Sequence, residues 1–405
     1  KDDLDLGMIV LKADNTLDEI VITHQKKLIE QKPDRIIFNV ENSVTSIGGD
    51  ALDALRIAPG LRVQNNSINL LGRGESRVMI NGRLLQLSAE DLTSYLNSIS
   101  ASDIKKIEVI TTPPAKYEAA GNGGLINIVL KKGQLNAWKN TISAVDNINT
   151  YNFFTLRNSL LYNKNKLSIS FNLNGTKGNS RNTEDFQVFY PESNWDIDIS
   201  SKDEQDNISA QLLLDYSISD KTIIGIQYLG NTKTPNLIDR SVSRIFNQSN
   251  ILDSLLINNG NNQVKVNSHL INLHTNTKLD TIGKGISFDL DYFTYDSNQN
   301  RDFITNSFSA NNDFLGINAS ANTFSNQNTD VEHPTKFMNL SYGLKVSSIK
   351  NTSDIQFFNT ITGTPVFDSN ISNTFKYEEN NQAIYISGLK KVNEKWDIQL
   401  GLRLE

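Results

Sequence analysis

Between residues 167 and 404 the chain repeatedly alternates apolar and polar residues, and this pattern constrains its fold more than any other feature. One example is residues 286–292, which read Ile-Ser-Phe-Asp-Leu-Asp-Tyr. Similar segments begin near residues 167, 208, 338 and 396. A period of two with one apolar face indicates antiparallel β-strands that have one dry face and one wet face.

The connections between these segments also alternate in length. Short turns are expected near 163–166, 219–221, 280–285 and 391–394, and long polar loops near 179–206, 231–262, 298–334 and 361–372. Short turns on one rim and long loops on the other are typical of outer-membrane barrels, although a soluble sandwich also alternates along its strands. Aromatic residues that suit an interfacial girdle stand near the strand ends: Tyr162, Tyr228, Tyr295 and Trp396.

The length of the strand-rich part predicts an incomplete barrel. About eleven strands are expected from 137 to 405, and the last one is still in progress where the sequence stops. An open sheet leaves two unpaired edges, which lipid does not tolerate. We therefore expect about half of a 22-stranded barrel, with the remainder of the barrel beyond this chain.

The first third of the chain mixes helix and strand signals. Asp50 is placed to cap a helix at 51–57, and residues 88–91 resemble a capping box ahead of a helix with Leu92, Tyr95, Leu96 and Ile99 on one face. Strands are expected at 35–40, 67–71, 77–80, 104–111 and 124–130. These elements predict a small α+β domain of about 100 residues.

Composition excludes several classes of function. The net charge of −6 argues against a nucleic-acid partner, and the absence of cysteine excludes thiolate sites. The four histidines show no metal spacing, and Gly72-Arg73-Gly74 precedes a β-type run rather than the helix that a dinucleotide site needs. We expect no catalytic residues, no metal and no cofactor, and we interpret Asp289 and Asp291 as part of a polar wall.

The order of short motifs in the first third is similar to the plug of TonB-dependent outer-membrane receptors, particularly the Bacteroidetes type. The motifs lie at 17–23 (LDEIVIT), 51–61 (ALDALRIAPGL), 71–74 (LGRG), 78–82 (VMING), 104–110 (IKKIEVI), 115–117 (AKY) and 121–128 (GNGGLINI). The resemblance implies a Gram-negative outer-membrane protein with three parts: an extension at 1–33, a plug at 34–133 and the N-terminal part of a transmembrane barrel at 134–405. It also implies that an N-terminal carboxypeptidase-regulatory-like domain is missing from this chain.

The resemblance assigns a partner to the N-terminal extension. Its TonB-box-like segment consists of Asp18, Glu19, Ile20, Val21, Ile22 and Thr23. A β-prone peptide of this kind can add as a strand to the sheet edge of a TonB-type energy-transducing protein. The other expected partners are outer-membrane lipid and, left open, a surface lipoprotein or another envelope protein. An edge strand of an upstream domain is the alternative interpretation of this segment.

Charged residues are expected where the plug meets the barrel. The candidates are Arg73, Arg77 and Arg83 on the plug and Asp215, Asp289, Asp291 and Asp397 on the polar faces of the strands. Those faces are expected to line the lumen, because charge is unfavourable at the lipid midplane. Solvated lumen charges without a partner are the alternative. Arg73, Glu75 and Arg77 are also candidates for substrate contact.

Three hypotheses for the whole protein follow. The leading one is an energy-coupled importer of a nutrient such as a metal chelate, a peptide or a glycan. The second is a plugged barrel that acts as a structural or assembly partner in an envelope complex. The third is a soluble or secreted β-rich binding module.

Overall fold

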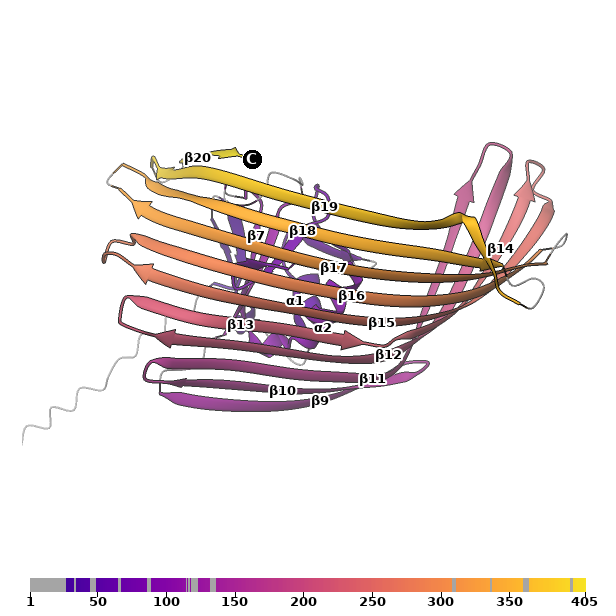
Figure 1. Cartoon of the computed structure of the whole chain (residues 1–405), viewed down its shortest axis with the longest axis horizontal. Helices are drawn as coiled ribbons and strands as arrows, with labels where there is room; N and C mark the ends of the chain where they lie inside the picture. Colours follow the sequence, from indigo (N-terminus) through magenta and orange to yellow (C-terminus); the bar gives the residue numbers. More distant parts are fainter. Residues whose placement is uncertain are drawn as a thin grey trace, which may run out of the picture.

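The computed structural model consists of a small α+β unit that lies against one face of a large curved antiparallel sheet (Figure 1). It describes residues 27–32, 34–43, 49–64, 67–85, 89–113, 115, 117, 123–131, 136–307, 311–335, 337–359, 364–393 and 396–405. The segment 18–23 lies outside these residues. Within the described ranges, no helix has the length and apolar character needed to cross a membrane.

The α+β unit, which we call the plug, is built on a six-stranded sheet in the order β1-β2-β7-β8-β5-β6. Its strands are β1 (Ile29–Gln31), β2 (Arg35–Phe38), β5 (Arg77–Ile80), β6 (Arg83–Leu84), β7 (Ile104–Ile110) and β8 (Leu125–Leu130). A separate hairpin joins β3 (Leu61–Gln64) and β4 (Ser67–Leu70), and the helices are η1 (Val40–Asn42), α1 (Ala51–Arg56), α2 (Ala89–Ser98) and η3 (Ala101–Asp103). Apolar side chains fully buried between the sheet and the helices form the core, including Leu55, Leu96, Ile107 and Ile126.

Helix α1 begins where the sequence predicts. The side chain of Asp50 accepts a hydrogen bond from the Asp53 backbone N–H, and the side chain of Asp53 accepts one from the backbone N–H of Asp50. This reciprocal capping box satisfies backbone donors that have no partner within the helix. In α2 the predicted apolar face is confirmed, because Tyr95 and Leu96 are buried.

Glycines in the first third of the chain allow a tight turn and a close approach of two backbone segments. Asn81 and Gly82 both have positive φ, 52° and 83°, in the tight turn between β5 and β6. At Gly123 an added Cβ would lie 1.8 Å from the carbonyl oxygen of Glu75, so no larger residue fits. The Gly-rich loop at 72–75 therefore packs its backbone directly against the start of the β8 segment.

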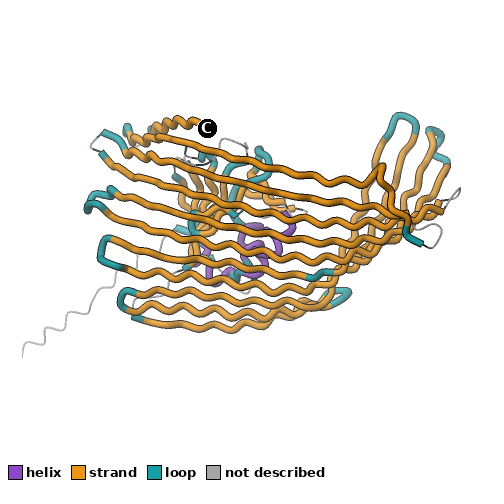
Figure 2. The backbone as a smooth tube through the Cα atoms, in the orientation of Figure 1, coloured by secondary structure: helices purple, strands orange, loops and turns teal. Residues whose placement is uncertain are grey.

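The large sheet, which we call the wall, has twelve strands, and all but one pair of consecutive strands form hairpins (Figure 2). They are β9 (Ala137–Ile148), β10 (Asn152–Lys164), β11 (Leu167–Phe189), β12 (Ser193–Ser217), β13 (Thr222–Lys233), β14 (Asn236–Asn247), β15 (Leu252–Lys278), β16 (Gly285–Ser307), β17 (Asn311–Pro334), β18 (Asn339–Asn359), β19 (Val366–Lys391) and β20 (Asp397–Leu404). Strand β14 pairs with the far ends of β12 and β15, beyond β13. The fold class of a plug against a partial antiparallel barrel is as predicted.

The two faces of the wall differ as the alternation predicts. On one face, apolar side chains such as Ile271, Leu273 and Ile384 are 40–60% exposed, as lipid-facing residues must be. On the opposite face lie polar residues such as Gln227 and Asn272, which are 1% and 0% exposed because the plug covers them. The polar face is therefore the lumen face.

The prediction of long polar loops was wrong for three segments. Most of 179–206, 231–262 and 298–334 is paired in strands that continue from the apolar belt, and β14 raises the strand count from about eleven to twelve. Apolar residues of these extensions no longer keep to the lipid-facing parity, since Ile197 and Ile199 of β12 lie an odd number of residues from Ile208. The period-two signal of the belt therefore does not continue although the strand pairing does. Figure 1 shows the extended strands bending away from the plug at one end.

Candidate functional site

The candidate functional site is the contact between plug and wall. Its centre is Arg83, which directly follows the Asn81-Gly82 turn and so projects from the tip of a tight hairpin. The Arg83 guanidinium donates from Nε to Asp289 Oδ1 at 3.2 Å and from Nη1 to Gln227 Oε1 at 3.1 Å. The Arg83 and Asp289 side chains are only 19% and 23% exposed, so the pair is substantially screened from water.

The Asp289 carboxylate belongs to a network that runs across four wall strands. Asn272 donates from Nδ2 to Asp291 at 2.7 Å and to Asp289 at 3.3 Å. The His274 ring joins this group to a third carboxylate, because Nδ1 lies 2.8 Å from Asn272 Oδ1 and Nε2 lies 2.9 Å from Asp215 Oδ1. The structure thus brings together one of the three expected arginines and three of the four expected aspartates.

A second polar contact joins the plug to the strand β10. Arg157 donates to the carbonyl oxygen of Asn97 at 3.0 Å, near the C-terminal end of α2, and lies 3.9 Å from Asp50, which caps α1. Burial raises the pKa of the Asp50 carboxyl to about 6, against the hydrogen bond from Asp53 and the nearby Arg157, which lower it. Burial also raises the pKa of Asp103, which faces Ser159 of the same strand.

A third contact lies at the end of the wall. The Arg403 guanidinium donates to the carbonyl oxygen of Ala115 at 3.3 Å, and a Cβ built on Gly401 would lie 2.9 Å from the Ala115 Cβ. Arg403 and Gly401 share the lumen face of β20 with Asp397. Asp397 itself is exposed, and within the described residues no contact joins it to the plug.

The remaining predicted residues lie elsewhere on the plug. Arg73 and Glu75 are exposed, and Arg77 is partly exposed at the start of β5. No ion pair joins Arg73 to the wall among the residues that the structure describes. Arg73, Glu75 and Arg77 therefore remain predicted substrate contacts. The contact between plug and wall is centred on Arg83.

Sequence reasoning missed Gln227, Asn272 and Arg157 as contact residues. Each lies on the lumen-facing parity of its strand, which the alternation of apolar neighbours reveals. An uncharged amide on a wet face carries no sign of its partner, so only the assembled fold selects it. The sequence also does not reveal an apolar contact between wall and plug, which we call the apolar seat. It consists of Leu229, Leu270 and Phe293, which face inward among polar neighbours and pack against the plug core.

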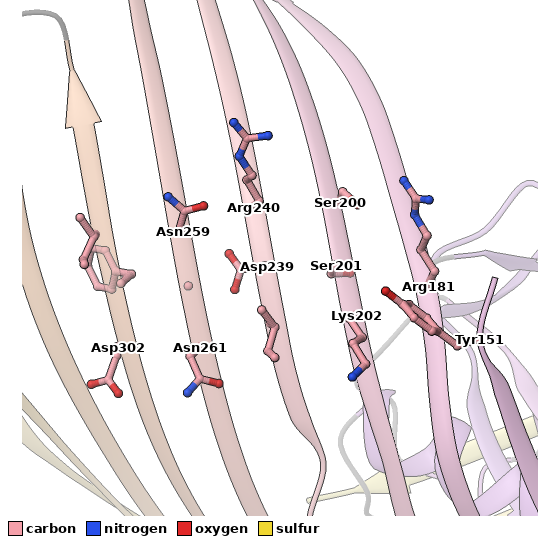
Figure 3. Close-up of a pocket in the computed structure, with 14 residues that line it drawn as sticks. Tyr151, Arg181, Ser200, Ser201, Lys202, Asp239, Arg240, Asn259, Asn261 and Asp302 are labelled. Carbon is pink, nitrogen blue, oxygen red and sulfur yellow. The ribbon is translucent and has the colours of Figure 1, made fainter.

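A pocket of about 650 Å³ lies away from the plug, on the extended parts of β11, β12, β14, β15 and β16, with Tyr151 at its edge. Figure 3 shows its charged lining: Arg181, Lys202, Arg240, Asp239 and Asp302. We call it the rim pocket. Among the described residues, no group of three or more histidine, aspartate or glutamate side chains is arranged to hold a metal ion.

Comparison with known proteins agrees with this architecture. Residues 277–405 match the outer membrane protein beta-barrel family. The ferric aerobactin receptor of Klebsiella pneumoniae is 40% identical over 106 residues, which cover 24% of this chain and 14% of that receptor.

Solved structures of outer-membrane receptors are also similar to this chain. The ferric-catecholate import receptor Fiu of E. coli K12 superposes with a TM-score of 0.51 at 11% identity, covering 91% of this chain and 65% of that one. The ferric yersiniabactin uptake receptor FyuA of Yersinia pestis covers 90% of this chain and 63% of that one, with a TM-score of 0.46 and 13% identity. The chain spans less than two thirds of each of these receptors, and the matched proteins are transport receptors rather than enzymes.

Proposed function

We propose that this protein, an outer-membrane protein of a Gram-negative bacterium with the plug-and-barrel fold of the TonB-dependent receptors, imports a nutrient by energy-coupled movement of its plug. The proposal divides the chain into an extension at 1–33, the plug at 34–133 and barrel at 134–405. It assigns no catalytic residue and no cofactor to the chain.

The observation that supports movement is the polar character of the plug–wall contact. An exposed ion pair contributes about 0–1 kcal/mol, a neutral hydrogen bond about 1 kcal/mol net, and a hydrogen bond to a charged group about 1.5–3 kcal/mol. The contacts of Arg83, Arg157 and Arg403 hold the plug in register on the wall. Because water can replace each of them, the plug can leave the wall without a large cost per contact.

The pull is assigned to the segment 18–23. It precedes β1, which is an edge strand of the plug sheet and, within the described residues, pairs with β2 through three residues. A TonB-type protein that adds to this segment by strand pairing would load the plug at one edge of its sheet. The named residues are those of the TonB-box-like segment, Asp18 to Thr23.

The substrate is proposed only as a nutrient. The matched receptors are named for ferric aerobactin and ferric catecholates, and at these identities and lengths their substrates do not transfer to this chain. Arg73, Glu75 and Arg77 are proposed to contact the substrate on the plug, and exposure of Arg73 and Glu75 is compatible with that role.

Growth of three strains tests the proposal. A strain that lacks residues 18–23, a strain that lacks the whole gene and the parent are compared on a panel of sole iron, nitrogen and carbon sources. We expect the first two strains to lose growth on the same source. The amount of protein in the outer membrane, measured by immunoblot, must be equal in the parent and the 18–23 deletion strain.

Two outcomes contradict the proposal. If the 18–23 deletion grows like the parent where the null strain fails, import does not use this segment. If the null strain grows on every source but an envelope complex loses its other members, the protein is an assembly partner rather than an importer.

A further inference from the structure

The rim pocket opens on the outer face of the wall, away from the lumen. One row of its lining runs across five strands, because Arg181 pairs with Lys202, Lys202 with Ile238, Ile238 with Asn261 and Asn261 with Asp302. Residues directly opposite one another in a sheet share a face. The parallel row Ser200, Arg240, Asn259 and Ile304 shares it as well.

That face is continuous with the lipid-facing belt. Along β12, β15 and β16, Lys202, Asn261 and Asp302 lie an even number of residues from Ile208, Ile271 and Tyr292 respectively. Each of these three apolar residues is exposed, between 40% and 59%. Since side chains separated by an even number of residues along a strand point to the same side, the pocket faces the surroundings of the barrel.

On the lumen side of the same strands, an ion pair joins Asp239 to Arg301. Asp239 lies between the two rows of the pocket, and its carboxylate accepts from Arg301 at 3.1 and 3.2 Å. Gly260 lies beneath the Asp239 carboxylate, which would collide with a Cβ at that position. Of the two acidic residues that line the pocket, Asp239 is therefore neutralised by a lumen-side arginine, and Asp302 lies on the face of the pocket beside the three cations.

The cations of the pocket have capacity to bind an anion. Within the described residues, Arg181 and Arg240 make no ion pair, while Arg244 on the same face of β14 is paired with Asp198. Lys202 lies 5.5 Å from the centre of the Tyr151 ring and 3.7 Å from the exposed Glu204. Guanidinium groups bind phosphate and carboxylate oxygens through two parallel hydrogen bonds.

We propose that the rim pocket binds a saccharide chain that bears phosphate or carboxylate groups. The three cations would bind the oxyanions, the amides of Asn259 and Asn261 would bind hydroxyls, and the Tyr151 ring offers a flat face to a sugar ring. The outer face above the lipid belt meets the saccharide layer of the outer leaflet. The ligand is therefore either part of that layer or a free acidic oligosaccharide. This site goes beyond import and does not depend on it.

Binding is measured on the detergent-solubilised protein by isothermal titration with three probes. They are rough lipopolysaccharide with a phosphorylated core, a galacturonic acid tetrasaccharide, and maltotetraose as the neutral match. We expect binding to at least one anionic probe and none to maltotetraose. Lipopolysaccharide alone identifies the membrane as the source, and the tetrasaccharide identifies a soluble ligand.

The variant Arg181→Gln/Arg240→Gln is expected to weaken that binding roughly tenfold or more, because each lost guanidinium removes a charge-assisted pair. The matched control is Arg244→Gln, four residues from Arg240 on the same face but outside the pocket, which should stay within about twofold. Asn261→Ala, a milder change, should weaken binding by a few-fold.

Three results would overturn the inference. One is that neither anionic probe binds the unaltered protein. Another is that Arg244→Gln weakens binding as much as the double variant, which would mean unspecific attraction to charge. The third is that maltotetraose binds as tightly as the anionic probes, which would mean that the charged groups do not select the ligand.

Discussion

The interior of the plug is held together by apolar packing, whereas the seam between plug and wall is mostly polar. Inside the plug, Leu55, Leu96 and Ile107 are completely buried among other apolar side chains. At the seam, Arg83, Gln227 and Asp289 meet through hydrogen bonds, with only a small apolar seat beside them. The difference agrees with the proposal that the plug persists as a unit while its attachment to the wall is released.

The largest effect is expected in the plug interior. Leu55→Ala should lower the free energy of plug unfolding by about 2–5 kcal/mol, because it removes buried methyl groups and leaves a cavity. Hydrogen exchange with mass spectrometry on plug peptides measures this in the detergent-solubilised protein. Leu71→Ala, at a position 62% exposed, is the control and should change it by less than about 0.5 kcal/mol. Equal effects of Leu55→Ala and Leu71→Ala would contradict the idea that buried apolar packing holds the plug together.

A smaller effect is expected at the seam. Arg83→Met should lower the free energy of plug release by about 1–3 kcal/mol, mostly because it leaves Asp289 without its partner in a partly buried position. In a double-mutant cycle with Asp289→Asn, the coupling energy should be about 1 kcal/mol. Exchange at α2 and β6 reports on release, with Arg73→Met as an exposed control. Zero coupling would mean that the ion pair does not hold the plug.

A third effect, of similar size, is a pH dependence. The folded plug holds the Asp50 proton more tightly than the unfolded chain, since burial raises its pKa from 3.8 to about 6. Plug stability should therefore fall by about 1–3 kcal/mol as pH rises from about 4 to about 6, and change little from this group above that range.

Asp50→Asn separates this titration from the capping role, because asparagine also caps helices well. Exchange at α1, corrected for its intrinsic pH dependence, should lose most of its slope in the variant. A residual slope is expected, because burial also raises the pKa of Asp103. An unchanged slope in Asp50→Asn would exclude this carboxyl as the source.

The same contrast explains what the sequence can predict. The cap at Asp50, the apolar face of α2 and the lumen-facing parity of Asp215, Asp289 and Asp291 each follow from local chemistry or from a periodicity of two. The strand extensions do not, because their apolar residues, such as Ile197 and Ile199 of β12, no longer keep to the parity of the lipid-facing belt.

Partner choice at the seam is equally hidden. Asp397 and Arg403 share one face of β20, and only their distance from the plug makes Arg403 the contact. Arg73 and Arg83 are equally plausible from composition, and the Asn81-Gly82 turn places only Arg83 against the wall. Such choices depend on three-dimensional positions rather than on residue type.

A reversible tether tests most directly whether the plug must leave the wall. The chain has no cysteine, and a Cβ on Gly401 would lie 2.9 Å from that of Ala115. A disulfide bond needs Cβ atoms about 3.5–4.5 Å apart, so a separation of the two backbones by about 1 Å allows one to form between plug and wall. In Ala115→Cys/Gly401→Cys cells, uptake of the nutrient identified by growth is compared before and after reduction, with each single variant as control. We predict that uptake stops while the disulfide is closed and returns on reduction. Full uptake with the disulfide closed would contradict the account.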